Sequence, residues 1–521
     1  MDKFCNLGQT PKMRTWILAI LLCAGLVGCG VKPPDRPLPP VQQSGELVVV
    51  TRNSPTTYYE DAEGRPAGLE HDLIELFAKD LGVQVRFVVA RQFNEILPFV
   101  DNHRAHMAAA GLSLTPERQR HFKFSVPYQM VAQQVVYNTN AADEKPAGIQ
   151  DLIGKRIEVV AGSSYAEHLR MLKKQYPALA WKENPVQESE ELLDKLALGV
   201  IDIVIADSNI VSVSNNFHPE LGVAFNLTEN QPLAWAFPWD VDPFLFEKAQ
   251  EFFVRIYKDG TLKRLLDRYY GHVKRLERAD VEGFLVAENA LLPKLRRFFH
   301  DAQEATELDW RLIAAIGYQE SHWDTLATSP TGVRGLMMLT GETADRMGVS
   351  DRLDPKQSIL AGARYVLSLK DALPDRVPEP DRTWLALAAY NSGYGHLEDA
   401  RILAKKRKLN PDSWTDLKKT LPLLSQAAYY EGVKHGYARG GESVIFVENV
   451  RTYYDILAKF EKPYQRVFST ASAKPAPPPE QTPSAAARSA PYSLGTSQTG
   501  QGIRPPVSAF RLDKAAIRPA R

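Results

Sequence analysis

The sequence predicts a multidomain protein in which an α/β domain precedes an all-α domain. From Glu46 to about Val273, short apolar runs alternate with helix-like segments, which is typical of α/β units with a largely parallel sheet. From about Phe284 to Leu457, strand-like runs nearly vanish, and apolar residues recur every three or four positions, as on one face of a helix. At 521 residues the chain is also too long for one compact core.

Individual elements follow from the same patterns. Short apolar runs predict strands at 47–50, 83–89, 157–160 and 201–205. Helical spacing in the first domain predicts helices at 69–81 and 189–198. In the second domain it predicts helices at 310–321, 359–369 and 384–390.

Composition indicates ordinary globular domains and excludes some partners. The chain is 44% hydrophobic and 24% charged, and 63 basic residues balance 62 acidic ones. Without a basic excess, nucleic acid is not an expected partner.

The N-terminal segment predicts export and lipidation. All three cysteines, Cys5, Cys23 and Cys29, lie in the first thirty residues, so the folded body has no thiol for catalysis, metal binding or disulfides. Basic residues precede an uncharged stretch at 15–28 that suits a secretory signal peptide spanning residues 1–28. Its end resembles the lipobox of bacterial lipoproteins, which implies a lipid on Cys29. An ordinary signal or anchor with an incidental cysteine is the alternative.

The resemblance also implies a location. Because Gly30 stands where an acidic residue would resemble the inner-membrane retention signal, we expect anchoring to the outer membrane, facing the periplasm. Proline and polar residues at 29–45 predict a flexible tether. The Pro-, Ala-, Ser- and Thr-rich segment at 463–521 has few large apolar residues and predicts a disordered tail.

Several separate motifs in the first domain carry one resemblance. They are Gly111-Leu-Ser-Leu-Thr-Pro-Glu-Arg118, Phe124-Ser-Val-Pro-Tyr128, Gly162-Ser-Ser-Tyr165 and Gly199-Val-Ile-Asp202, the last leading to Asp207. Together they resemble the solute-binding proteins of amino-acid transporters. The resemblance implies a two-lobed, periplasmic-binding-protein-like domain over residues 46–273.

That resemblance assigns a ligand pocket. Arg118 and Ser113 would hold an α-carboxylate, to whose two oxygens a guanidinium offers paired donors. Ser164 opens the second lobe, and Asp207 would hold an α-amino group. The ligand would be an amino acid or a cell-wall peptide, and the sequence does not specify the ligand's side chain. Alternatively, the arginine begins a helix and faces solvent.

One helix of the second domain carries an unusual glutamate. Asp309 is a good N-cap for a helix over 310–321, and Leu312, Ile316 and Glu320 follow at intervals of four on one face. Glutamate is rarely buried unless it is paired or functional. Desolvation would keep this acid protonated, as a general acid requires. The alternative is an apolar stripe that reaches the surface at the helix end.

The neighbouring motifs favour catalysis. Glu320-Ser-His-Trp323, Gly332-Val-Arg-Gly-Leu-Met337 and Ala389-Tyr-Asn-Ser-Gly393 resemble the soluble-type, lysozyme-like family of lytic transglycosylases. The resemblance implies an all-α, lysozyme-like catalytic domain over 283–462 that acts on the glycan strands of peptidoglycan, with Glu320 as acid and base. The implied substrate-binding residues are Ser329, Met338, Thr343, Tyr390, Asn391 and Tyr453.

Two positions depart from the family pattern. Met338 stands where the family usually has glutamine, so a polar contact to the glycan is lost or moved. In the late motif of the family, which is Asn449-Val-Arg-Thr-Tyr453 here, Asn449 stands where an acidic residue is usual, and Glu448 comes one place early.

The resemblance implies a reaction that needs one carboxylate and no metal or cofactor. A substrate N-acetyl group can replace the second carboxylate of ordinary glycosidases. Glu320 would protonate the oxygen that links N-acetylmuramic acid to N-acetylglucosamine. It would then deprotonate the muramyl C6 hydroxyl, which gives 1,6-anhydro ends. Such a lyase is of the exotransglycosylase type, although the sequence leaves endo or exo preference open. If Asp324 took part instead, the enzyme would hydrolyse the bond.

Two functions remain for the whole chain. In the first, the solute-binding domain senses a cell-wall fragment and regulates cleavage allosterically. In the second, a binding or scaffolding protein uses its lysozyme-like domain only to hold on to the wall. The intact glutamate-serine motif favours the enzyme.

Overall fold

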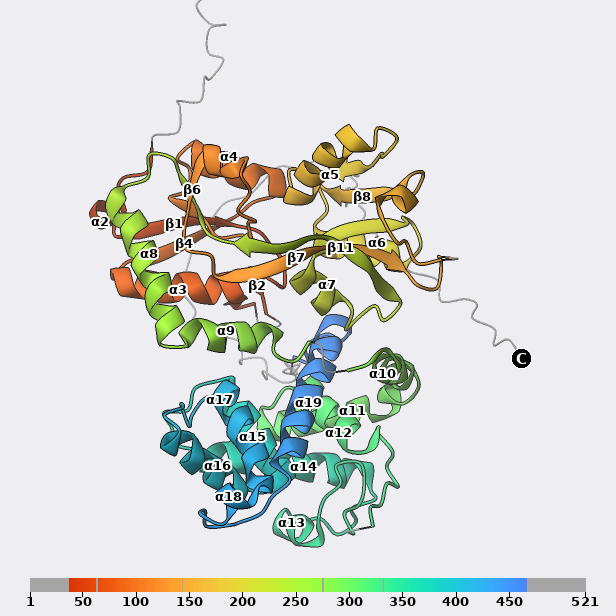
Figure 1. Cartoon of the computed structure of the whole chain (residues 1–521). Helices are drawn as coiled ribbons and strands as arrows, with labels where there is room; N and C mark the ends of the chain where they lie inside the picture. Colours follow the sequence, from red (N-terminus) through yellow and green to blue (C-terminus); the bar gives the residue numbers. More distant parts are fainter. Residues whose placement is uncertain (1–36, 62–63, 143, 274–275, 331, 466–521) are drawn as a thin grey trace, which may run out of the picture. The chain divides into compact units, whose positions relative to one another are not determined.

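The computed structural model describes residues 37–61, 64–142, 144–273, 276–330 and 332–465. The predicted signal peptide, Cys29, most of the tether and nearly all of the tail lie outside the described residues. Within them, a two-lobed α/β domain is followed by a helical domain, as predicted (Figure 1).

The first lobe is built on a five-stranded sheet with the order β4-β1-β5-β12-β6. The strands are β1 (Glu46–Thr51), β4 (Gln84–Val89), β5 (Met107–Ala108), β6 (Phe122–Phe124) and β12 (Ala236–Pro238). The helices of this lobe are α3 (Leu69–Leu81), α4 (Ile96–Asp101), α8 (Pro243–Lys258) and α9 (Thr261–Tyr270), with 3-10 turns at Phe93–Glu95 and Arg118–Arg120. Strand β1 lies inside the sheet, and its four central residues are fully buried, which explains their unbroken apolar run.

The second lobe is built on a sheet with the order β11-β7-β10-β8-β9. Its strands are β7 (Gln129–Asn138), β8 (Ile157–Val160), β9 (Lys182–Asn184), β10 (Ile203–Asp207) and β11 (Leu221–Leu233). Its helices are α5 (Ser164–Gln175), α6 (Ser189–Ala197) and α7 (Ser208–Ser214), with a 3-10 turn at Ile149–Leu152.

The expectation of largely parallel sheets is only partly right. Strand β1 is parallel to β4 and β5, and β8 is parallel to β9 and β10, but β7 is antiparallel to both β10 and β11. The chain enters the second lobe along β7 and returns along β11, so these paired crossing strands run in opposite directions (Figure 1).

The described end of the predicted tether is structured. Residues Val41–Ser44 form the short helix α2, and Val41 is 2% exposed in the core of the first lobe. A small hairpin, β2 (Tyr59–Glu60) and β3 (Pro66–Ala67), follows β1.

The second domain is helical around one hydrophobic core. Its helices are α10 (Arg278–Ala290), α11 (Leu292–Thr306), α12 (Trp310–Ser321), α13 (Gly341–Arg346), α14 (Pro355–Ala372), α15 (Asp381–Ser392), α16 (Tyr394–Lys406), α17 (Trp414–Thr420), α18 (Ala427–Tyr430) and α19 (Gly440–Phe460), with a 3-10 turn at Leu421–Ser425. Among its described residues, β pairing is limited to isolated bridges at Thr328, Arg334 and Leu339. None of the described helices combines the length and apolar character needed to cross a membrane.

Candidate active site and ligand pocket

Glu320 lies in the last turn of α12, where the sequence predicts it. The Asp309 carboxylate accepts a hydrogen bond from the backbone N–H of Arg311 at 2.8 Å and so caps the helix. The residues from Trp310 to Tyr318 are all buried, and Glu320 itself is half-buried. Burial raises the pKa of Glu320 to about 8, so the side chain is mainly protonated at neutral pH.

Two hydroxyls hold the turn at Gly335–Leu339 against the glutamate helix. Ser321 donates to the carbonyl of Leu336 at 2.8 Å, and Tyr390 donates to the carbonyl of Met337 at 2.7 Å. A Cβ on Gly335 would lie 1.8 Å from the carbonyl oxygen of Arg352, and the glycine has a φ of +79°. The turn therefore requires glycine and is fixed from both α12 and α15.

Tyr390 is the predicted substrate residue most clearly tied to Glu320. Burial raises the pKa of Tyr390, and the negative charge that Glu320 can carry raises it further. The phenol thus stays protonated close to the glutamate. Met338, next to the tyrosine-bonded carbonyl, is half-buried and has a φ of +46°, a conformation that is uncommon for residues other than glycine.

The remaining predicted substrate residues differ in exposure. Asn391 is exposed, and its Oδ1 accepts a hydrogen bond from Ser443 at 2.8 Å. Ser329 is half-buried, and Thr343 is 9% exposed at the start of α13. Tyr453 is only 4% exposed, and its ring stacks on Phe284 with centroids 4.6 Å apart. These roles stay predictions, and a direct sugar contact from Tyr453 would require the core to rearrange.

Asp324 has the surroundings of a helix-end acid. It is exposed, and its Oδ1 accepts the backbone N–H of Leu326 at 2.9 Å. This geometry favours a role in shaping the turn after α12.

The residues predicted to hold a ligand lie around one pocket between the two lobes of the first domain. Its lining includes Ser113, Arg118, Ser164 and Asp207, and its cavity measures about 10 Å³. That is room for about one water molecule. An amino acid therefore enters only if the lobes separate.

Arg118 is held by atoms of both lobes. Its Nε donates to Glu167 of α5 at 2.9 Å, and its two terminal nitrogens donate to the carbonyls of Ser113 and Gly162, each at 3.1 Å. The Ser164 hydroxyl donates to that of Ser113 at 3.1 Å. The guanidinium thus already binds a carboxylate, which belongs to the protein.

Two further carboxylates of the second lobe bond to the first lobe. Glu188 accepts from the guanidinium of Arg52 at 2.8 Å, and Glu190 accepts from the hydroxyl of Ser54. Sequence reasoning missed these glutamates and Glu167. Of the three, only Glu167 could have been predicted from the sequence. It lies three residues after Ser164 and is therefore on the same face of the helix.

Asp207 lies at the end of β10 with its carboxylate in the pocket. The side chain is 4% exposed, and burial raises its pKa to about 6. Its backbone N–H donates to the hydroxyl of Tyr165 at 3.2 Å. Within the described part of the chain, its Oδ1 has no hydrogen-bond partner, so an ammonium there would satisfy a buried acceptor.

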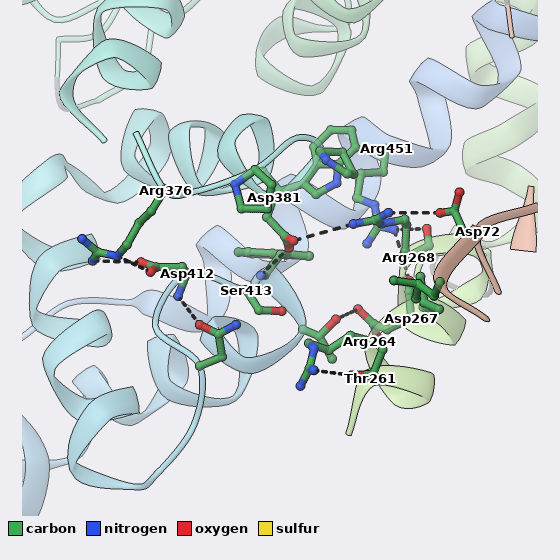
Figure 2. A pocket seen from close by; sticks show the side chains of 18 of the residues that line it. Asp72, Thr261, Arg264, Asp267, Arg268, Arg376, Asp381, Asp412, Ser413 and Arg451 are labelled. Carbon is green, nitrogen blue, oxygen red and sulfur yellow. Dashed lines mark hydrogen bonds and ion pairs between the residues drawn. The ribbon is translucent and has the colours of Figure 1, made fainter. Parts of the chain in front are cut away.

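A polar cavity of about 500 Å³ lies beside the last turn of α9 (Figure 2). Arg451 of α19 donates to the backbone carbonyls of Asp267 and Arg268, at 3.2 and 2.7 Å. The Asp267 carboxylate accepts from Lys418 at 2.5 Å and from Thr415 at 2.8 Å. This cluster bonds the end of the first domain to α17 and α19.

Glu448 belongs to the same cluster. It is 1% exposed, bonds to the indole of Trp414 at 2.5 Å, and pairs with Arg451 at 3.1 Å. The acidic residue that comes one place early in the late motif is therefore a buried structural partner in this chain. No cluster of metal-ligating side chains occurs among the residues that the structure describes.

Known proteins resemble both domains. Residues 47–272 match the family model of bacterial extracellular solute-binding proteins, family 3, and residues 297–412 match that of the transglycosylase SLT domain. A solved structure of an ancestral arginine-binding protein bound to arginine is 25% identical, covers 43% of this chain and 98% of that protein, and has a TM-score of 0.40. The two domain matches define the class: a peptidoglycan lytic transglycosylase that carries a solute-binding domain ahead of its catalytic domain.

Whole-chain relatives narrow the class to one family. The membrane-bound lytic murein transglycosylase F of Methylobacillus flagellatus is 50% identical over 454 residues, which are 87% of this chain and 96% of that protein. The protein of the same name from Nitrosospira multiformis is 50% identical over 89% of this chain and 96% of its own. The chain belongs to the membrane-bound lytic murein transglycosylase F family.

Proposed function

We propose that the chain cleaves the β-1,4 bond between N-acetylmuramic acid and N-acetylglucosamine and leaves 1,6-anhydromuramic ends, with Glu320 as both acid and base. The half-buried Glu320, whose pKa burial raises to about 8, carries this proposal. A general acid must hold its proton at the working pH, and an apolar site is one way to achieve this.

The proposed reaction has two proton transfers through one carboxyl. Glu320 gives its proton to the glycosidic oxygen while the substrate's acetamido oxygen supports C1 of the muramyl residue. The resulting carboxylate then takes the proton of the C6 hydroxyl as that oxygen bonds to C1. The glutamate ends protonated, as it began, and no water is consumed.

Product analysis tests this reaction. Purified sacculi are digested with the enzyme, and the released muropeptides are identified by mass spectrometry. We expect anhydromuropeptides, which weigh one water less than the corresponding reducing muropeptides. Mainly reducing ends would instead indicate hydrolysis and return Asp324 to consideration.

We further propose that the first domain binds an amino acid or cell-wall peptide and thereby regulates cleavage. The buried Arg118 and Asp207 offer opposite charges to the two ends of a zwitterion. For the binding to regulate, the ligand must favour one arrangement of the protein over another.

Helix α19 offers a physical route for that coupling. It contacts the first lobe through Arg451, and it contacts the second lobe through Lys459, whose Nζ lies 3.4 Å from the Asp194 carboxylate. On the same helix, Tyr453 packs against Tyr318 of α12, with ring centroids 4.9 Å apart. Separation of the lobes would change the contacts of a helix that packs on the glutamate helix.

Calorimetry and turnover test the regulatory claim together. Wall peptides are titrated into the wild type and Arg118→Ala, and sacculus turnover is measured with and without peptide. We expect binding only to the wild type and a change in turnover of roughly five- to 150-fold. Unchanged turnover at saturating peptide would refute regulation even if the variant lost binding.

We also propose that a lipid on Cys29 anchors the chain to the outer membrane. The lipobox-like sequence before Cys29 and the membrane-bound name of the relatives support this. Cys29→Ser should move the protein from the outer-membrane fraction to the soluble periplasmic fraction. Retention of the variant in the outer membrane would refute the lipid anchor.

A further inference from the structure

The start of the described chain is fixed to one edge of the first lobe. Leu38 packs against the apolar cluster that includes Ala236 of β12. The Nδ1 of His106 accepts the backbone N–H of Val48 at 2.9 Å, so its Nε2 carries the proton and donates to the carbonyl of Pro39 at 3.0 Å. The backbone is therefore held against this edge from Leu38 onward.

The sequence limits how far this edge can lie from the proposed lipid on Cys29. Leu38 comes nine residues after Cys29, and an extended chain spans at most about 3.4 Å per residue, or about 30 Å in all. A compact domain of about 230 residues is roughly 45 Å across. With its anchor in a membrane, the domain can therefore touch that membrane with the edge that holds Leu38 but not with its opposite side.

Exposed aromatic side chains lie at the same edge. Trp239 directly follows β12 and is 59% exposed, which makes it the most exposed tryptophan, tyrosine or phenylalanine among the described residues. Its neighbour Asp240 lies 3.6 Å from His103, in the loop that also carries His106. Phe244, in the first turn of α8, is 39% exposed. Neighbouring apolar side chains left in water mark a contact surface.

The chemistry of this edge suits the headgroup region of a lipid bilayer. An indole prefers that region because its ring is apolar and its N–H is polar. The ammonium of Lys248 lies 5.9 Å from the centre of the Phe244 ring, and that of Lys123 lies 5.7 Å from the centre of the Phe246 ring. Cations at this depth contact lipid phosphates. Because Asp240 adds an exposed negative charge, we expect the rings to contribute more than net charge does.

We propose that Trp239 and Phe244 insert into the headgroup region of the membrane that carries the lipid anchor, and so hold the first lobe against the bilayer. The inference rests on the proposed function, because it assumes a lipid on Cys29. It adds a second membrane contact, made by the folded domain itself, which the short tether strengthens by keeping the rings close to the bilayer. Among the exposed apolar side chains described on the second lobe, none is aromatic, so that lobe stays free to move.

A single fluorescent label measures lipid contact at this edge. The described residues contain no cysteine, so Asp240→Cys in the full chain puts one thiol in the folded body for an environment-sensitive fluorophore. The labelled chain is reconstituted into vesicles of phosphatidylethanolamine and phosphatidylglycerol, with or without brominated acyl chains. We expect a blue-shifted emission that the brominated chains quench. The same label on Leu198→Cys, at a position of the second lobe that is 79% exposed, should show neither effect.

Two double variants then test the rings themselves. With the label at position 240, Trp239→Ser/Phe244→Ser should lose most of the quenching, because the rings no longer hold the edge in the lipid. Leu198→Ser/Val200→Ser is the matched control, since it removes two side chains of the second lobe that are 79% and 53% exposed. It should keep the quenching. Every variant should still float with the vesicles through its lipid.

Each outcome decides the inference. Flotation without quenching at position 240, or equal quenching after loss of both rings, would overturn it and leave the lipid anchor standing. A blue shift that brominated chains do not quench, and that grows with the number of protein chains per vesicle, would assign the surface to a second copy and also overturn it. If the natural chain does not float with the vesicles, the lipid anchor of the proposed function fails, and this inference fails with it.

Discussion

Replacing Glu320 with glutamine should stabilise the protein at high pH while removing its activity. The native glutamate keeps its proton until about pH 8, whereas in an unfolded chain it loses the proton near the ordinary glutamate pKa of 4.5. Between these values, the unfolded state releases a proton that the native state retains, so wild-type stability falls as pH rises. Glutamine has no proton to lose, so its advantage should grow from about pH 5 to about pH 8 and then level off.

The size of this effect follows from the pKa difference. One pKa unit corresponds to about 1.4 kcal/mol, which sets an upper limit of about 5 kcal/mol for this glutamate. Because Glu320 is only half-buried and water can screen its charge, we expect about 2–4 kcal/mol at pH 9. For a helical domain of this size, that corresponds to roughly 5–10 °C in melting temperature.

Scanning calorimetry of the wild type and Glu320→Gln at pH 5, 7 and 9 measures the difference. Glu342→Gln serves as the control, because it makes the same chemical change at an exposed position in the first turn of α13 and should not reproduce the gain of Glu320→Gln. The claim that Glu320 is a desolvated acid would be refuted if Glu320→Gln did not raise the melting temperature, or raised it equally at pH 5 and pH 9.

Three further substitutions probe the active-site turn. Tyr390→Phe removes the bond to the Met337 carbonyl and should cost about 1 kcal/mol of stability by denaturant unfolding and about tenfold or more in sacculus turnover; wild-type turnover would contradict its place in the site. Asp324→Asn should keep turnover within about threefold of wild type, because its carboxylate only caps the following turn; a loss of a hundredfold would make it a second acid. Gly335→Ala should cost more than about 2 kcal/mol by thermal melting, since its Cβ would overlap the Arg352 carbonyl; an unchanged melting temperature would show that the turn can move.

Local patterns in the sequence predict the catalytic half well. The N-cap Asp309, the stripe of apolar residues and the end of α12 are all set by contacts within four residues of each other, so spacing alone places Glu320 at the end of a buried face. The fixation of Gly335–Leu339 by Ser321 and Tyr390 could not be predicted, because it depends on how α12 and α15 pack around this turn.

The ligand pocket was less predictable, for a physical reason. Its motifs place Arg118 and Asp207 at the pocket, but the bonds from Arg52 to Glu188 and from Ser54 to Glu190 join residues 136 positions apart. Such pairs depend on how the two lobes meet, which no local pattern specifies. For the same reason, the antiparallel crossing strands were missed, since pairing direction follows the path of the chain between the lobes.

The most direct test of catalysis by Glu320 is the release of anhydromuropeptides from sacculi by Glu320→Gln, measured by mass spectrometry beside the wild type. Glutamine keeps the shape of the side chain but cannot transfer a proton. The variant should therefore bind sacculi and melt cooperatively while releasing less than about a thousandth of the wild-type amount. Release within about tenfold of wild type from the folded variant would contradict the assignment of Glu320 as acid and base.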